Sequence, residues 1–119
     1  RHRRDAVDPI ALLEGNLSMK TPDACDGLQD IRHAIDSLDH QIIDLMRQRM
    51  AYVKAAARFK PTESSIAAPE RVAQMLPQRR EWAEQAGLDP HFVETLFAQI
   101  IHWYIGQQVL HWRAMRTLA

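Results

Sequence analysis

Apolar residues recur at alternating steps of three and four along a stretch from Leu28 to Lys60 that contains neither Gly nor Pro. The positions are Leu28, Ile31, Ile35, Leu38, Ile42 and Leu45. This is the heptad pattern of a long helix that packs lengthwise on other helices. Asp26 and Gln29 have the spacing of a capping box, and Pro61 stops a helix after Lys60. The pattern predicts one helix over residues 28–60.

Two further helices follow. Pro69 suits the first turn of a helix, Pro77 should kink it, and Gly87 suits its C-terminal end. Asp89 as N-cap before Pro90 predicts a third helix that runs close to the C-terminus. Their apolar stripes comprise Val72, Met75, Leu76, Arg79, Trp82 and Ala83, and then Phe92, Val93, Leu96, Phe97, Ile100, Ile101, Tyr104, Ile105, Val109 and Trp112. No segment shows a strand pattern. We expect an all-α chain of three helices, of which the first is very long and much the longest.

The first eighteen residues differ from the rest. They open with three arginines in four residues, and Met19 then begins a stretch that reads like a natural start. We interpret residues 1–18 as an added leader, with a basic interaction arm as the alternative. Residues 19–119 are then a single helical domain, of a size that can bury a modest core.

The length of the first helix predicts self-association. At 1.5 Å per residue it would extend about 50 Å. A compact monomer of this size would be only about 35 Å across. The apolar seam would therefore be exposed in a monomer, and we expect a homodimer that shares it.

Composition excludes several classes of function. Lys plus Arg equals Asp plus Glu at 15 each, so bulk charge indicates neither a nucleic acid nor a membrane surface as partner. The single cysteine, Cys25, excludes an internal disulfide and fits a reducing compartment. No apolar run is long enough to span a membrane, and we expect a cytoplasmic protein. Because metal, phosphate-loop and dinucleotide motifs are missing, we expect neither a metal nor a cofactor.

Cations on apolar helix faces are the candidate chemistry. Arg49 falls on the heptad seam, where burying an unpaired charge costs several kcal/mol, so it needs a partner or an anionic ligand. Lys60 follows eleven residues later, about 20° round the helix and about 16 Å along it. Val53 and Ala56 lie between them as a small apolar floor. The set has room for a small dianion, although Lys60 alone could be a surface cation with its stem packed down.

Arg32, Gln108 and Arg71 are weaker candidates. Arg32 lies about 25 Å from Arg49 and about 100° round the helix, so one small ligand cannot touch both within a chain. In an antiparallel dimer, Arg32 of one chain could lie near Arg49 of the other, or it could simply pair with Asp36. Gln108 lies on an apolar stripe, where a buried amide needs partners: it is satisfied locally or donates into the cation pocket. Arg71 is an ordinary helix-start charge or a rim contact.

Four segments carry a resemblance to the all-helical chorismate mutase family, and within it to the isochorismate pyruvate lyases: GLQDIRHAIDSLDHQIIDLMRQRM, YVKAAARFK, APERVAQMLPQRREWAEQAGLD and FVETLFAQIIHWYIGQQ. They lie between Met19 and the C-terminus. The stretches FK, PERV and FAQIIHWYI are closer to the lyases. Mutases commonly have an Arg-Glu pair where this chain has Pro69-Glu70-Arg71, which puts mutase-type recognition of the chorismate ring hydroxyl in doubt.

The resemblance implies an intertwined homodimer with the chorismate mutase type II fold. It implies conversion of isochorismate to salicylate and pyruvate by a cofactor-free pericyclic reaction, in salicylate and siderophore biosynthesis. The positions that match the family's substrate-binding residues are Arg32 of the other chain, Arg49, Lys60 and Gln108. The same resemblance places Val53, Ala56, Tyr104 and Ile105 in the walls and Arg71 at the rim.

Two alternative functions and one hypothesis about a loop remain open. The chain could be a chorismate mutase that makes prephenate, with weak mutase activity also possible in a lyase. It could instead be a non-catalytic helical dimerisation module, in which Arg49 pairs with an acid across the interface. The loop at residues 61–68, next to Lys60, could close over a substrate as a lid.

Overall fold

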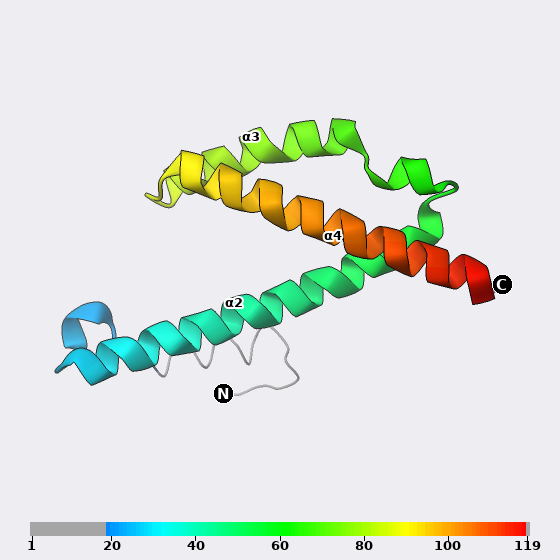
Figure 1. The fold of residues 1–119 in the computed structure, drawn as a ribbon. Helices are drawn as coiled ribbons and strands as arrows, with labels where there is room; N and C mark the ends of the chain where they lie inside the picture. The colour runs from blue at the N-terminus through cyan, green and yellow to red at the C-terminus, as the bar shows by residue number, and fades with distance from the viewer. Residues whose placement is uncertain (1–18, 119) are drawn as a thin grey trace. The chain divides into compact units, whose positions relative to one another are not determined.

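The computed structural model describes residues 19–118, and the proposed leader at residues 1–18 lies outside them. Figure 1 shows three α-helices, which are α2 (Leu28–Ala56), α3 (Pro69–Gln85) and α4 (Pro90–Leu118). Short 3₁₀ segments are η1 (Pro22–Ala24), η2 (Ala57–Phe59) and η3 (Glu63–Ile66). No strand occurs in residues 19–118. The all-α class with a long first helix is confirmed, but α4 has the same 29 residues as α2, so the first helix is not much the longest.

Two compact units can be distinguished by their internal contacts, one ending at Gln48 and the other beginning at Arg49. The boundary falls inside α2. The single helical domain over residues 19–119 stays a prediction. Across residues 19–118, no helix combines the length and the apolar character that a membrane crossing requires.

The start of α2 corrects the predicted capping box. The first helical residue is Leu28, and the backbone N–H of Asp26 donates to the carboxylate of Asp30 at 3.0 Å, not to Gln29. Lys20 donates to the carboxylates of Asp26 and Asp30, at 3.1 and 2.9 Å. The N–H donor from Asp26, and then Lys20, lower the pKa of Asp30. A carboxylate is a stronger acceptor than an amide, which explains why Asp30 takes the place predicted for Gln29.

The predicted heptad seam is exposed in this chain. None of the α2 side chains is buried. Five of the six seam residues are exposed, namely Leu28, Ile35, Leu38, Ile42 and Leu45. An exposed row of this length on one helix calls for a second surface to cover it. The homodimer itself stays a prediction.

Helix ends follow the predicted signals with small shifts. The α-helical part of the first helix ends at Ala56, and η2 carries the helical run on to Phe59, one residue before Lys60. Gly87 adopts a φ of 76° just after α3, where Leu88 N–H bonds to Ala83 O and Gly87 N–H to Glu84 O. These two bonds form a Schellman motif, in which a left-handed residue is needed.

The beginning of α4 also follows prediction. The Asp89 carboxylate accepts from the N–H groups of His91 and Phe92, at 2.9 and 3.4 Å, and so caps α4 as predicted. Pro77 lies inside α3 as expected, and the kink at this residue stays a prediction.

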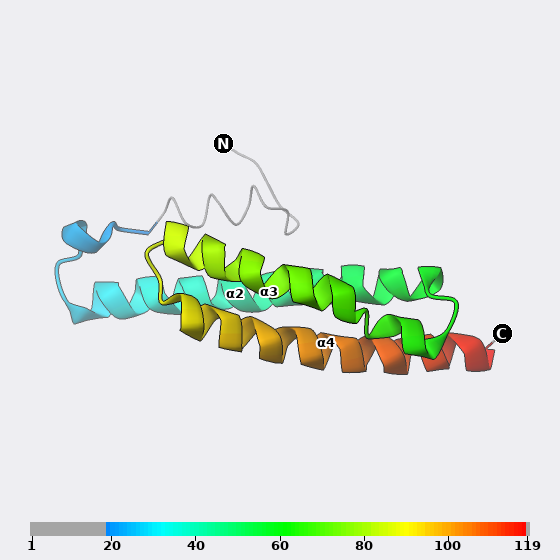
Figure 2. The same ribbon diagram turned by 90° about the horizontal axis from the view of Figure 1, so that it is seen from above.

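The second unit has a small core between its helices. Helix α3 packs along α4, and η2 and η3 also pack on α4 (Figure 2). The buried apolar side chains are Ala57, Ile66, Met75, Ala83, Ile101 and Tyr104. Arg80 of α3 pairs with Glu94 of α4 at 2.9 Å. This packing supports one cavity, described next.

Candidate active site

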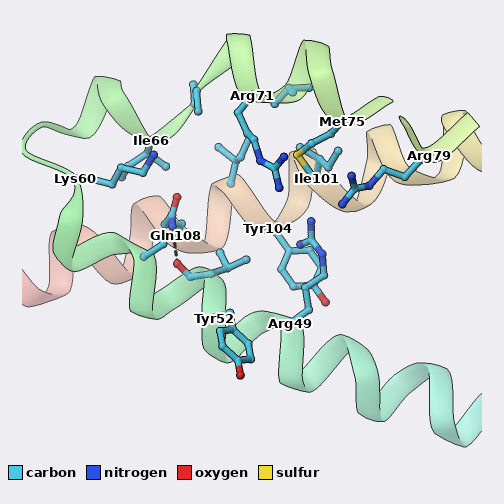
Figure 3. A pocket seen from close by; sticks show the side chains of 16 residues that line it. Arg49, Tyr52, Lys60, Ile66, Arg71, Met75, Arg79, Ile101, Tyr104 and Gln108 are labelled. Atoms are coloured by element: carbon cyan, nitrogen blue, oxygen red, sulfur yellow. Dashed lines mark hydrogen bonds between the residues drawn. The ribbon is translucent and has the colours of Figure 1, made fainter. Parts of the chain in front are cut away.

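A cavity of about 370 Å³ lies within the second unit. Residues of α2, the connection to α3, α3 and α4 line it (Figure 3). The lining is Arg49, Tyr52, Val53, Ala56, Lys60, Ile66, Ala67, Ala68, Arg71, Val72, Met75, Arg79, Ile101, Tyr104, Ile105 and Gln108. Its volume is in the range of small-molecule sites. Four of these side chains are cationic and none is acidic, so the cavity suits a small anion.

Arg49 presents an unsatisfied charge to this cavity. Its guanidinium carbon lies 4.3 Å from the centroid of the Tyr104 ring. Its Nη1 is buried without a hydrogen-bond partner. Burial, opposed by Tyr104 and reinforced by the neighbouring Arg71, lowers the pKa of Arg49. An arginine stays charged even so, and the arrangement therefore favours a bound carboxylate.

Arg79 is a partly buried cation of the cavity that was not proposed as a site residue from the sequence, and its Nη1 donates to Gln78 Oε1 at 2.8 Å. Its guanidinium carbon lies 4.6 Å from the Trp82 ring centroid and 5.6 Å from that of Phe97. Its Nε is buried without a partner. Burial, and then the charges of Arg71 and Arg49, lower its pKa. The available signal was a charge on an apolar stripe, the same signal that singled out Arg49.

Lys60 lines the cavity directly after η2. Its Nζ donates to the backbone carbonyl of Ser65 at 3.3 Å, and the side chain lies beside Ile66 in Figure 3. The ammonium is therefore turned toward the connection to α3 and the cavity, rather than out to solvent as a simple surface cation.

Gln108 is satisfied locally, which is one of the two alternatives left open by the sequence. It is 6% exposed, and its Nε2 donates to the backbone carbonyl of Val53 (Figure 3). An amide nitrogen carries two hydrogens, and donation of the second into the cavity that Gln108 lines stays a prediction.

The structure brings together eight of the nine predicted site residues. Arg49, Lys60, Gln108, Arg71, Val53, Ala56, Tyr104 and Ile105 all line the cavity. Eight further lining residues were not predicted from the sequence, namely Tyr52, Ile66, Ala67, Ala68, Val72, Met75, Arg79 and Ile101. Several of these stood on predicted stripes, but Ile66, Ala67 and Ala68 follow no periodic pattern. Ala68 has a φ of 43°, and such a backbone bend is not signalled by an alanine.

Arg32 is the exception. It is exposed on the part of α2 that belongs to the first unit, and it does not line the cavity. Within residues 19–118, Arg32 forms no ion pair with Asp36, which was the other role considered for it. In the same range, no group of three or more His, Cys, Asp or Glu side chains could hold a metal ion.

Known proteins resemble this chain over most of its length. Residues 31–109 match the family described as chorismate mutase type II. A Pseudomonas aeruginosa protein named isochorismate pyruvate lyase is 60% identical over 101 residues, which are 85% of this chain and 100% of that protein. T-proteins of Haemophilus influenzae and Enterobacter agglomerans are 35% and 33% identical, over 64% and 62% of this chain but 20% of each T-protein. With both the family match and a full-length relative, the chain belongs to the chorismate mutase type II family.

Proposed function

We propose that this chain is an isochorismate pyruvate lyase, which converts isochorismate to salicylate and pyruvate. The name of its full-length relative from Pseudomonas aeruginosa supports the proposal. The observation that carries it is the cavity itself, with four cations, no acid and a buried Arg49 Nη1 that has no partner. Isochorismate has a ring carboxylate and an enolpyruvyl carboxylate, so it matches the charge of this lining.

The reaction needs positioning rather than a nucleophile. A ring hydrogen moves to the enolpyruvyl methylene while the ether C–O bond breaks, which yields pyruvate and an aromatic ring. The protein then has to hold a reactive conformer and stabilise negative charge on the ether oxygen. Arg49 would hold a carboxylate, for which its planar fork is suited. Lys60 and the second N–H of Gln108 would donate to a carboxylate and to the ether oxygen, with no cofactor involved.

The complete site would require a second copy of the chain. The exposed seam on α2 favours an intertwined homodimer. Arg32 lies outside the cavity of its own chain, and in an antiparallel dimer it would reach the partner's cavity beside Arg49. Arg71 would contact the substrate at the rim, and Val53, Ala56, Tyr104 and Ile105 would shape the walls. A role in salicylate and siderophore biosynthesis, in the cytoplasm, stays a prediction.

Chorismate mutase is the second candidate, because a 4-amino-4-deoxychorismate mutase of Streptomyces pristinaespiralis is 29% identical over 66% of this chain. The cavity lining counts against it as the main activity: Arg71 lines the cavity and Glu70 does not. We do not favour a non-catalytic dimerisation module, because Arg49 lines a cavity together with three further cations and no acid.

Incubating the purified protein with isochorismate, and separately with chorismate, tests the proposal. Salicylate fluorescence and prephenate formation report the two reactions. We expect rapid salicylate release from isochorismate and little prephenate from chorismate. Fast prephenate with little salicylate would move the chain to the mutase branch, and no product from either would overturn both enzyme proposals.

A further inference from the structure

Side chains from the last turns of α4 hold the segment that carries Lys60. The indole Nε1 of Trp112 donates to the backbone carbonyl oxygen of Lys60 at 2.9 Å. A guanidinium N–H of Arg116 donates to the same oxygen at 3.1 Å. Arg113 forms two bonds with the carboxylate of Glu63, both at 2.7 Å. Between 50 and 56 residues separate the partners along the chain, so these contacts are tertiary.

The two hydrogen bonds from Trp112 and Arg116 satisfy a backbone carbonyl of a kind that usually has no partner at the end of a helix. Lys60 follows the last residue of η2, and its own N–H bonds to Ala57 O at 3.1 Å. The carbonyl of such a residue has no partner in its own helix. Here Trp112 and Arg116 supply two. Both peptide groups that flank the Cα of Lys60 are therefore fixed, one by η2 and the other by α4.

Trp112 and Arg116 are also arranged relative to each other. The guanidinium carbon of Arg116 lies 4.3 Å from the centroid of the Trp112 ring. They are four residues apart, which places them on one face of α4. A stacked pair that donates to one oxygen loses less conformational freedom on forming each bond than two independent side chains would.

We propose that Trp112, with Arg116, is a positioning residue for Lys60. By fixing the Lys60 backbone on α4, it keeps the Lys60 side chain in the lining of the cavity, where the ammonium donates to Ser65 O of the neighbouring connection at 3.3 Å. The ion pair of Arg113 with Glu63 holds the following residues of the same connection. The kinetic part of this inference rests on the proposed function, because it assigns Lys60 a ligand in the cavity.

Trp112 could position Lys60 or could only stabilise the fold, and a double-mutant cycle with Lys60 distinguishes these two roles. Trp112→Phe keeps an aromatic ring near Arg116 but removes the indole N–H together with part of the ring volume, as Trp103→Phe does at the control position. We expect its kcat/KM for isochorismate to fall about 10-fold to 100-fold, since displacing a reacting group by about an ångström has effects of that order. In a Lys60→Ala background the same change should cost nothing further. Salicylate binding, followed by fluorescence, completes the cycle if turnover of Lys60→Ala is too slow.

Trp103→Phe is the matched control, because Trp103 lies on the same helix, is 52% exposed and packs edge-on against Tyr104, a contact that Phe retains. Its turnover should match that of the parent chain. Arg116→Gln is the second test variant, which removes an exposed donor to the same oxygen and should lower kcat/KM in the same direction. A loss from Trp112→Phe that persists in full without the Lys60 side chain would overturn the inference, as would full activity of both variants.

Amide hydrogen exchange tests the anchoring without any substrate. Residues 60–66 should exchange faster in Trp112→Phe than in the parent chain and in Trp103→Phe. Unchanged exchange would overturn the inference whatever the activity. If the parent chain failed to consume isochorismate, the proposed function would fail, while the exchange comparison would still decide whether α4 positions Lys60.

Discussion

The guanidinium of Arg49 lies over the ring of Tyr104, with 4.3 Å between the guanidinium carbon and the ring centroid. The ring occupies one face of the planar group and accepts none of its in-plane hydrogen bonds. Nη1 therefore stays without a partner although it is buried. Tyr104 is itself 2% exposed and cannot move away easily. On the proposed function, this pair would hold a carboxylate-binding group in place before any ligand arrives, at a cost in stability that the ligand would recover.

Substituting Arg49 should separate activity from stability. Arg49→Lys keeps the charge but loses the planar fork, and we expect kcat/KM for isochorismate to fall about 100-fold, since a hydrogen bond to a charged group contributes about 1.5–3 kcal/mol. Arg49→Met should abolish turnover and leave the thermal midpoint equal or higher, because it removes a buried unpaired charge.

The control for Arg49 is Arg47→Lys. Arg47 is exposed and pairs with Asp44 at 3.0 Å, so the change should alter neither quantity appreciably. Steady-state kinetics and thermal unfolding measure both. If Arg49→Met lost stability and turned over normally, Arg49 would be a structural residue.

The sequence predicted helix order and ends because local chemistry dictates them. Asp89 before Pro90 and Gly87 after α3 signal backbone needs that few other residues meet, and both were identified correctly. The start of α2 differs from the prediction because Gln29 and Asp30 are both candidates to accept the Asp26 N–H, and Asp30 accepts it. Lys20, which lies outside the helix, also donates to Asp30, and helix periodicity does not reveal that contact.

The site was predictable where its residues stood out against an apolar face. Arg49 and Gln108 are polar groups on apolar stripes, and both line the cavity. Arg79 gave the same signal and was passed over as part of a stripe. Ile66 could not be placed, because it lies in η3 and becomes buried only through packing on α4. The same holds for Trp112, whose bond to Lys60 joins positions that no sequence spacing relates.

Arg79 should contribute to anion binding. Its Nε is buried without a partner in a cavity that Arg49 and Arg71 also line, so an anion bound there would provide the missing acceptor. Arg79→Gln should raise the KM for isochorismate, or the Kd for salicylate, about 10-fold, the effect of about 1.4 kcal/mol in a charged hydrogen bond. Arg80→Gln is the matched control, because the neighbouring Arg80 pairs with Glu94 and does not line the cavity.

The outcome for Arg79 also distinguishes a role between chains. If Arg79→Gln left ligand binding unchanged and weakened self-association, measured by analytical ultracentrifugation, the unpartnered Nε would serve an interface rather than the ligand.

Gln108→Glu should damage both fold and function. The amide donates to Val53 O, and a carboxylate there would face that carbonyl with no hydrogen to offer. We expect a loss of about 1–3 kcal/mol in the free energy of unfolding at neutral pH, together with lost turnover. Since a protonated carboxyl regains a donor, both losses should diminish as the pH falls. Gln107→Glu is the neighbouring control, and denaturant unfolding at several pH values makes the measurement. A loss that did not change with pH would contradict the donor role.

The ion pair of Glu63 with Arg113 predicts how the stability of the connection before α3 depends on pH. Hydrogen bonds from Arg113 lower the pKa of Glu63 below its ordinary value of 4.5. A carboxyl with a depressed folded pKa contributes stability above the unfolded value, and this contribution is lost as the pH falls through the folded value. Carbon NMR of the Glu63 carboxyl should therefore show a midpoint below 4.5 that rises toward it in Arg113→Gln. Equal midpoints in the two chains would mean that the pair does not persist in solution.

Mixed dimers offer the strictest test of whether Arg32 acts in the partner's site. Arg32→Ala and Arg49→Ala should each be inactive as homodimers. In a dimer of one chain of each kind, one site keeps Arg49 of the first and Arg32 of the second, and the other site loses both. When equal amounts are refolded together, random pairing makes half of the dimers mixed. If the two-fold dimer shares residues across its interface, the mixture should therefore regain about a quarter of the parental activity.

The control is a mixture of Arg49→Ala with Lys60→Ala. Both residues line the cavity of the same chain, so every site in a mixed dimer lacks one of them. Restoration in the second mixture, or none in the first, would refute the assignment of Arg32 to the partner's cavity.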